Sequence, residues 1–105
     1  MHRSLPLPES RPSIPTGAWT KVTTIEPAKR TMLRVVNVDA SNVFRVCLVP
    51  VGGAAPTAAT AGLPLLAGSP GGAYEENTMN GTYADIYAYQ ASGGTLATLF
   101  VQEGK

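Results

Sequence analysis

Apolar and polar residues alternate through residues 82–102. The alternation has a period of two and breaks at residues 91–94, where Ser92, Gly93 and Gly94 indicate a turn. This pattern predicts two strands paired as a hairpin, with Ile86 opposite Leu99. One face of the hairpin is apolar and is expected to pack on a core: Ala84, Ile86, Ala88, Ala97, Leu99 and Val101. The other face is aromatic and mixed, which is unusual for a surface that meets only water: Tyr83, Asp85, Tyr87, Tyr89, Leu96, Thr98, Phe100 and Gln102.

Residues 31–38 and 43–50 show the same alternation and predict a second hairpin, because residues 39–42 are typical of a turn. Its expected core face carries Leu33, Val35, Asn37, Phe44, Val46 and Leu48. Arg34 and Arg45 fall on the opposite face at diagonal cross-strand positions, where like charges repel mildly. They are therefore expected to have an acidic partner, drawn from Glu75, Glu76, Asp85 or another chain. A solvated or internally paired patch and a partner-facing pair both remain open.

The remaining segments predict short strands separated by turns. Residues 19–26 form a strand that ends at Pro27, with Trp19 expected at the edge of the core. Residues 63–66 form an edge strand because of Pro64, and residues 73–77 form another short strand. Residues 51–62 are small and aperiodic, which is typical of a long exposed loop. About seven strands without a convincing helix predict an all-β domain over residues 19–105, a single antiparallel β-sandwich or small barrel of jelly-roll-like type.

Residues 1–18 contain four prolines and predict an extended arm. Leu5, Leu7 and Ile14 are apolar and spaced for burial. The segment is either a disordered leader or an arm that docks on a neighbouring subunit, since a stiff segment loses little entropy on docking. It has no long apolar run, so we expect neither a signal peptide nor a membrane span, and synthesis in the cytoplasm.

Charge and composition narrow the classes of function. Charged residues make up 14% of the chain and the formal net charge is +1, whereas about 25% is usual in soluble domains. A sparsely charged surface favours contact with another protein. The sequence has no basic stripe, so nucleic-acid binding is not expected. Its single cysteine, Cys47, excludes an internal disulfide and is expected to be a small packed side chain.

The sequence carries no recognisable catalytic or metal-binding pattern. His2 is the sole histidine and lies in the arm, which argues against a nucleophilic triad. Glu75 and Glu76 are adjacent and point to opposite faces of a strand, so they do not form an acid/base pair. Zinc, calcium-loop and phosphate-loop motifs are absent from the sequence. We therefore expect a protein that is not an enzyme, with no catalytic residues, cofactor or bound metal.

The order of features through residues 30–105 resembles the small β-sandwich virion proteins of tailed bacteriophages. Two apolar strands, LRVVNV and FRVCLV, precede a small-residue loop, the stretch GSPGGAYE and a closing YADIYAYQASGGTLATLFVQEG. The positions that carry the resemblance are Leu66-Ala67-Gly68, Gly72-Ala73-Tyr74-Glu75 and Ile86-Tyr87-Ala88. Proteins of this kind are structural, so the resemblance implies a head decoration (cement) protein or a collar, tail or fibre component. It implies no catalytic residues.

The leading hypothesis is a capsid decoration protein that binds the outer surface of the head shell, in the virion. Its expected partners are the major capsid protein and further copies of itself in a symmetric oligomer, with a trimer as one form. The expected interface residues are Leu5, Leu7, Ile14, Trp19, Arg34, Arg45, Tyr83, Tyr87, Tyr89, Leu96 and Phe100. The alternative is a tail, collar or fibre component whose tyrosines meet a neighbouring tail protein or a host-surface glycan.

Overall fold

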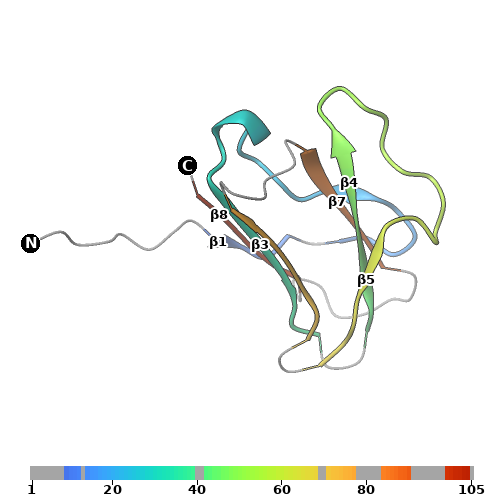
Figure 1. Cartoon of the computed structure of the whole chain (residues 1–105). Helices are drawn as coiled ribbons and strands as arrows, with labels where there is room; N and C mark the ends of the chain where they lie inside the picture. The colour runs from blue at the N-terminus through green and yellow to red at the C-terminus, as the bar shows by residue number, and fades with distance from the viewer. Residues whose placement is uncertain are drawn as a thin grey trace, which may run out of the picture.

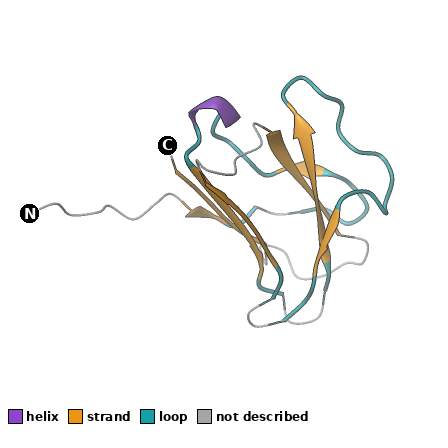
Figure 2. Cartoon of the chain, in the orientation of Figure 1, coloured by secondary structure: helices purple, strands orange, loops and turns teal. Residues whose placement is uncertain are grey.

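Two four-stranded sheets face each other in this protein (Figures 1 and 2). The computed structural model describes residues 9–12, 14–39, 42–68, 71–77, 84–90 and 99–104. One sheet has the order β1 (Glu9–Ser10), β8 (Leu99–Gly104), β3 (Met32–Asn37), β6 (Ala73–Asn77). The other has the order β2 (Thr20–Lys21), β7 (Ala84–Gln90), β4 (Phe44–Pro50), β5 (Leu63–Leu65). A short 3-10 turn, η1 (Pro27–Lys29), precedes β3. The predicted all-β sandwich is confirmed.

The strand pairing follows a single rule along the chain. The first strand pairs with the eighth, the second with the seventh, the third with the sixth and the fourth with the fifth, all antiparallel. The β3–β8 and β4–β7 ladders then join these pairs into two sheets. A folded-back chain rolled up in this way is a jelly roll, so the jelly-roll-like prediction is also confirmed.

The core lies between the sheets and consists of the predicted inward-facing positions. Leu33 and Val35 on β3 and Leu99 and Val101 on β8 are at most 1% exposed. They face an equally buried set on β4 and β7: Phe44, Val46, Ile86 and Ala88. Period-two alternation identified these positions because each sheet turns one face to the core and one outward.

Both predicted hairpins are wrong. β3 and β4 belong to different sheets, and so do β7 and β8. Each pair of strands therefore crosses from one sheet to the other instead of pairing with its neighbour. The alternation could not distinguish the two connections, because a hairpin and a crossover place the same residues toward the core. The consequence is that the aromatic face predicted for residues 82–102 is divided between opposite sides of the molecule.

The predicted first strand, over residues 19–26, is shorter than expected. Only Thr20–Lys21 forms β2, and the Val22 amide extends the pairing by one bond to the Ile86 carbonyl, at 2.9 Å. The edge position of β5 is confirmed, and residues 51–62 contain no strand, as predicted.

Much of the predicted arm is part of the sandwich. β1 pairs with β8, and Ile14 is 1% exposed within the core. The side chain of Gln90 donates a hydrogen bond to the Ile14 carbonyl, and the Gly17 amide donates to the Gln90 carbonyl at 2.9 Å. Ile14 is thus a core residue, and the prediction that it contacts a partner is wrong. Its side chain is removed from water by the chain's own core, so little of it is left to bury against another protein. Leu5 and Leu7 lie outside the described residues.

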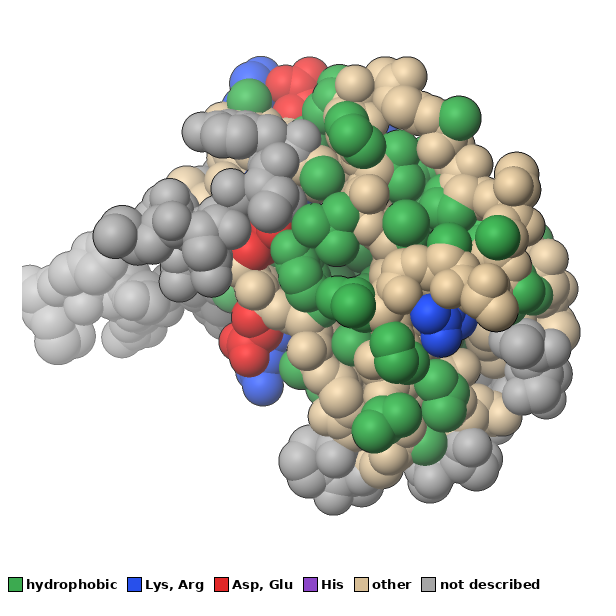
Figure 3. Space-filling view, turned by 45° about the vertical axis from the view of Figure 1, so that its right-hand side comes forward, with side chains coloured by type: hydrophobic (Ala, Val, Ile, Leu, Met, Phe, Trp, Pro, Cys, Tyr) green, Lys and Arg blue, Asp and Glu red, His purple; other side chains and the backbone are tan. Residues whose placement is uncertain are grey.

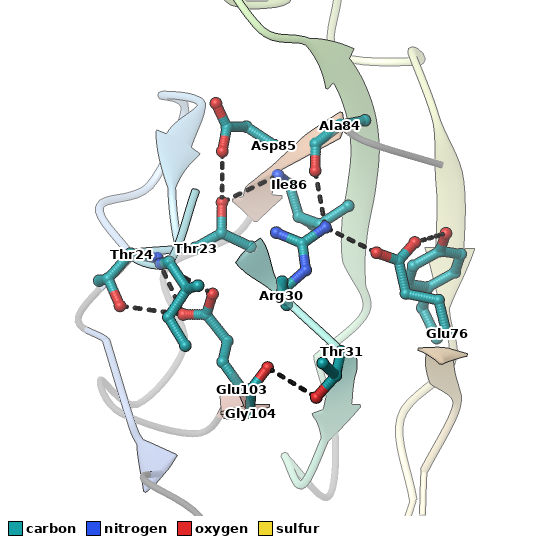
Figure 4. A network of polar contacts seen from close by, with 12 residues as sticks. Thr23, Thr24, Arg30, Thr31, Glu76, Ala84, Asp85, Ile86, Glu103 and Gly104 are labelled. Atoms are coloured by element: carbon teal, nitrogen blue, oxygen red, sulfur yellow. Dashed lines mark hydrogen bonds and ion pairs between the residues drawn. The ribbon is translucent and has the colours of Figure 1, made fainter. Parts of the chain in front are cut away.

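Buried polar contacts join the sheets at the end where β3 begins (Figure 4). The Arg30 guanidinium donates to Glu76 on β6 at 2.6 Å and to the carbonyl of Ala84, on the other sheet, at 2.8 Å. The Tyr74 hydroxyl donates to the second Glu76 oxygen at 2.7 Å. Glu103 on β8 accepts three hydrogen bonds from Thr24 and Ile25, which fixes the segment after β2. The buried charges of Arg30 and Glu76 are therefore paired inside the fold, although Nη1 of Arg30 is buried without a hydrogen-bond partner among the described residues.

Asn37 organises the opposite end. It is fully buried, and its amide nitrogen donates to the carbonyls of Asn42 and Leu65, both at 2.8 Å. Its side-chain oxygen accepts from the Asp39 amide at 2.8 Å. These bonds join the end of β3 to the end of β5 and to Asn42, which lies shortly before β4.

Candidate partner-binding face

Four of the predicted interface residues lie together on the outer side of the β2-β7-β4-β5 sheet. Arg45 on β4 is directly opposite Tyr89 on β7, and Cys47 is opposite Tyr87. The Trp19 ring packs against the Tyr89 ring, with centroids 5.1 Å apart and planes tilted by 33°. We call this group the aromatic face: Trp19, Arg45, Cys47, Tyr87 and Tyr89. All five side chains are half-buried.

The alternation of β7 positions this face. Ala84, Ile86, Ala88 and Gln90 point into the core, so Asp85, Tyr87 and Tyr89 must point outward. Asp85 is held by Lys21, with the charged atoms 3.5 Å apart, and by the Thr23 hydroxyl at 3.1 Å. The opposite charges of Lys21 and Asp85, beside the aromatic face, are therefore paired within the chain.

Two side chains of the aromatic face, Trp19 and Arg45, form hydrogen bonds with the loop of residues 51–62 and hold it against this face. The Trp19 indole donates to the Ala58 carbonyl at 3.1 Å. The Arg45 guanidinium donates to the carbonyls of Ala61, Thr60 and Gly62, at 2.8, 2.9 and 2.9 Å. Gly62 has a φ of 74°, and a Cβ there would overlap the Val46 carbonyl, so the end of the loop lies directly against β4.

The expected acidic partner is present for one arginine and absent for the other. Arg34 lies 3.7 Å from Glu75 in an exposed pair on the β1-β8-β3-β6 sheet. Arg45 contacts loop carbonyls, and within the described residues it has no ion pair. The expected repulsion between Arg34 and Arg45 is wrong, because the two residues lie on different sheets.

Of the other predicted interface residues that the structure describes, none joins the aromatic face. Phe100 is on the outer side of the opposite sheet, where the Arg11 guanidinium lies 6.0 Å from its ring centroid. Tyr83 and Leu96 lie outside the described residues. A single aromatic patch running through residues 82–102 is therefore not formed.

Sequence reasoning missed a group of exposed apolar side chains. Val38, Val43 and Leu66 are 37%, 42% and 64% exposed, and each lies one residue beyond the end of β3, β4 or β5. Leu63, on the edge strand, is 53% exposed. We call these four residues the apolar end. For Val38, Val43 and Leu66, the position just outside a strand and next to turn residues was the available signal.

Hydrophobic side chains gather across the middle of the face seen in Figure 3, and acidic ones lie toward its left and upper rim.

Within the described part of the chain, no cluster of His, Cys, Asp and Glu could hold a metal ion. No helix in that part is long and apolar enough to cross a membrane. Comparisons with family models, curated proteins and solved structures found no match. The geometry is that of a β-sandwich with exposed apolar side chains beside three strand ends and an aromatic group on the outer side of one sheet.

Proposed function

We propose that this protein is a decoration protein of a tailed-bacteriophage head, which binds the outer surface of the shell as a symmetric oligomer. The observation that carries the proposal is the apolar end. Leu63 and Leu66 expose more than half of their surface area, whereas Leu33, Leu65 and Leu99 are buried in the core. Exposed apolar patches of this kind mark contact sites between proteins.

The hydrogen bonds at this end support the same function. Asn37 bonds to Asp39, Asn42 and Leu65, which lie next to Val38, Val43 and Leu66 along the chain. A preorganised surface loses little conformational entropy on binding, which favours a permanent structural contact. A protein that binds only the assembled shell stabilises the shell by mass action. The jelly-roll topology is compatible with this role, since it occurs in viral capsid domains, but a fold alone does not establish function.

The first test is the copy number of the chain in purified particles of the phage that encodes it, measured by quantitative mass spectrometry against the major capsid protein. A copy number equal to that of the capsid protein, or a simple fraction of it, is expected. A number like that of tail or portal proteins would favour the alternative below. Absence from the particle would contradict both.

The second test addresses the apolar end with purified shells that lack the chain. Leu66→Ser and Val43→Ser are expected to weaken shell binding while leaving the melting temperature nearly unchanged, because both side chains are already exposed. Val51→Ser is the matched control: Val51 is 66% exposed but lies at the opposite end of β4. Equal binding by all three variants would exclude the apolar end as the contact.

The aromatic face favours a second candidate, a tail or fibre component that binds a host glycan. Trp19 and Tyr89 form a paired aromatic surface, and aromatic rings stack on sugar rings. Glycan-array binding that is abolished by Tyr87→Ala would favour this candidate. An array without signal would leave the decoration role as the proposal.

A further inference from the structure

The guanidinium of Arg45 is held in a fixed position on an outer face, which is unusual for a long flexible side chain. Three hydrogen bonds to the carbonyls of residues 60–62 involve Nε and Nη2. Those carbonyls are themselves placed by Gly62, which lies against β4, and by the bond from Trp19 to Ala58. The rotamer entropy that an arginine ordinarily loses on binding is therefore largely lost already in the folded chain.

The same geometry leaves one end of the guanidinium available. Nη1 makes no hydrogen bond with the described residues, and it is not among the buried unsatisfied atoms, so it contacts solvent. Its two N–H groups are donors, and an arginine has no acceptor. The three carbonyls that contact Nε and Nη2 are neutral, so the positive charge of Arg45 is solvated and has no ion pair within the part of the chain that the structure describes.

The surroundings of Arg45 favour an anionic group over water. Tyr89 and Pro64 are its direct neighbours across the two adjoining strands. The Trp19 ring covers the far side of Tyr89. An opposite charge brought to the open end of this guanidinium is attracted by a cation that has no ion pair with the described residues.

We propose that Arg45 binds a carboxylate side chain of the partner, an Asp or Glu on the outer surface of the capsid protein. The inference rests on the proposed function and specifies the chemistry of the contact. Nη1 donates to the carboxylate oxygen in a charge-assisted hydrogen bond, while Nε and Nη2 keep the loop carbonyls. Aromatic side chains of the same face exclude water around this bond.

The test measures binding of the full chain to purified shells by sedimentation at several salt concentrations. Arg45→Gln is expected to raise the Kd about tenfold or more and to flatten its salt dependence, because a charge-assisted contact is lost. Arg34→Gln is the matched control: it removes the same charge from the opposite sheet, where Glu75 already pairs with it, and is expected to change the Kd less than twofold. Trp19→Phe releases the loop without changing the charge, and it is expected to weaken binding less than Arg45→Gln.

Each contrary result has a defined meaning. If Arg34→Gln weakens shell binding as much as Arg45→Gln, the loss is caused by the change in net charge. If Trp19→Phe weakens it as much, the loss is caused by a change in the position of the loop. Either result overturns the proposal. Unchanged binding by Arg45→Gln overturns it directly, with the decoration role intact. If the wild-type chain does not bind shells, the decoration role fails and this inference fails with it.

A chemical crosslink gives independent evidence. In Arg45→Lys, a carbodiimide is expected to join the new amine to an Asp or Glu of the shell protein, and peptide mass spectrometry would identify the pair. Arg34→Lys is expected to give no crosslink to the shell. Crosslinks from both positions, or from Arg34→Lys alone, would contradict a specific site at Arg45.

Discussion

Removing the positive charge from the buried pair of Arg30 and Glu76 should destabilise the fold severely. The two side chains are 1% and 4% exposed and lie 2.6 Å apart. In Arg30→Met, the Glu76 carboxylate keeps the Tyr74 hydroxyl but loses the charge that compensates its burial, and the Ala84 carbonyl loses a donor. Breaking a buried ion pair from one side costs about 3–5 kcal/mol. A small domain has about 5–15 kcal/mol in total, so we expect a fall in Tm of more than about 10 °C.

The double-mutant cycle separates pairing from packing. Glu76→Gln alone is expected to cost about 3 kcal/mol, because a buried guanidinium is then left without its carboxylate. The double variant Arg30→Met/Glu76→Gln should cost clearly less than the sum, since both buried charges leave together. Equilibrium urea unfolding, followed by Trp19 fluorescence, measures each free energy of unfolding.

Arg34→Met is the control, because its pair with Glu75 is exposed and 3.7 Å long, and we expect a loss below about 1 kcal/mol. The reasoning would be refuted if Arg30→Met cost no more than this control. Strict additivity of the two buried substitutions would refute it as well.

Three further results are expected. Gly62→Ala should lower the free energy of unfolding in urea clearly more than Gly17→Ala. Both glycines have positive φ, but only a Cβ at position 62 would meet backbone atoms, whereas the space at position 17 is open. Equal losses would contradict the close approach of Gly62 to β4. Asn37→Leu should lower the free energy of unfolding by at least about 2 kcal/mol, because the Leu65 carbonyl and the Asp39 amide lose their partner inside the fold. A smaller loss in urea unfolding would show that these groups find other partners. Trp19→Phe should increase amide hydrogen exchange within residues 51–62 and leave global stability within about 1 kcal/mol; unchanged exchange would mean that the indole does not hold the loop.

Local alternation identified core side chains on the long strands, but it did not identify Ile14 as part of the core. Leu33, Val35, Phe44, Val46 and Ile86 were predicted to face inward and are buried. Pro64, within β5, also carried correct information, since it marked an edge strand, whereas the strand expected to end at Pro27 ends at Lys21. These features depend on one residue and its immediate neighbours, which is why a sequence reveals them.

The candidate contact surface was only partly predictable. Trp19, Arg45, Tyr87 and Tyr89 were named from the sequence, and the structure brings them together on one sheet. The three carbonyls that hold Arg45 belong to a loop of small residues without any pattern, and these contacts could not be anticipated. For the apolar end, the positions of Val38, Val43 and Leu66 beside turns were visible in the sequence, but which strand ends lie together was not.

The amino-acid sequence by itself determined an all-β domain, the inward face of each main strand and an outer surface poor in charge. Only the tertiary structure decided which strands pair, and it separated Phe100 from Tyr87 and Tyr89 and Arg34 from Arg45. The physical reason is that side-chain direction repeats every two residues along one strand, whereas strand pairing is set by backbone hydrogen bonds between distant segments. Every backbone group can form such bonds, so the choice among partners rests on how the whole core closes.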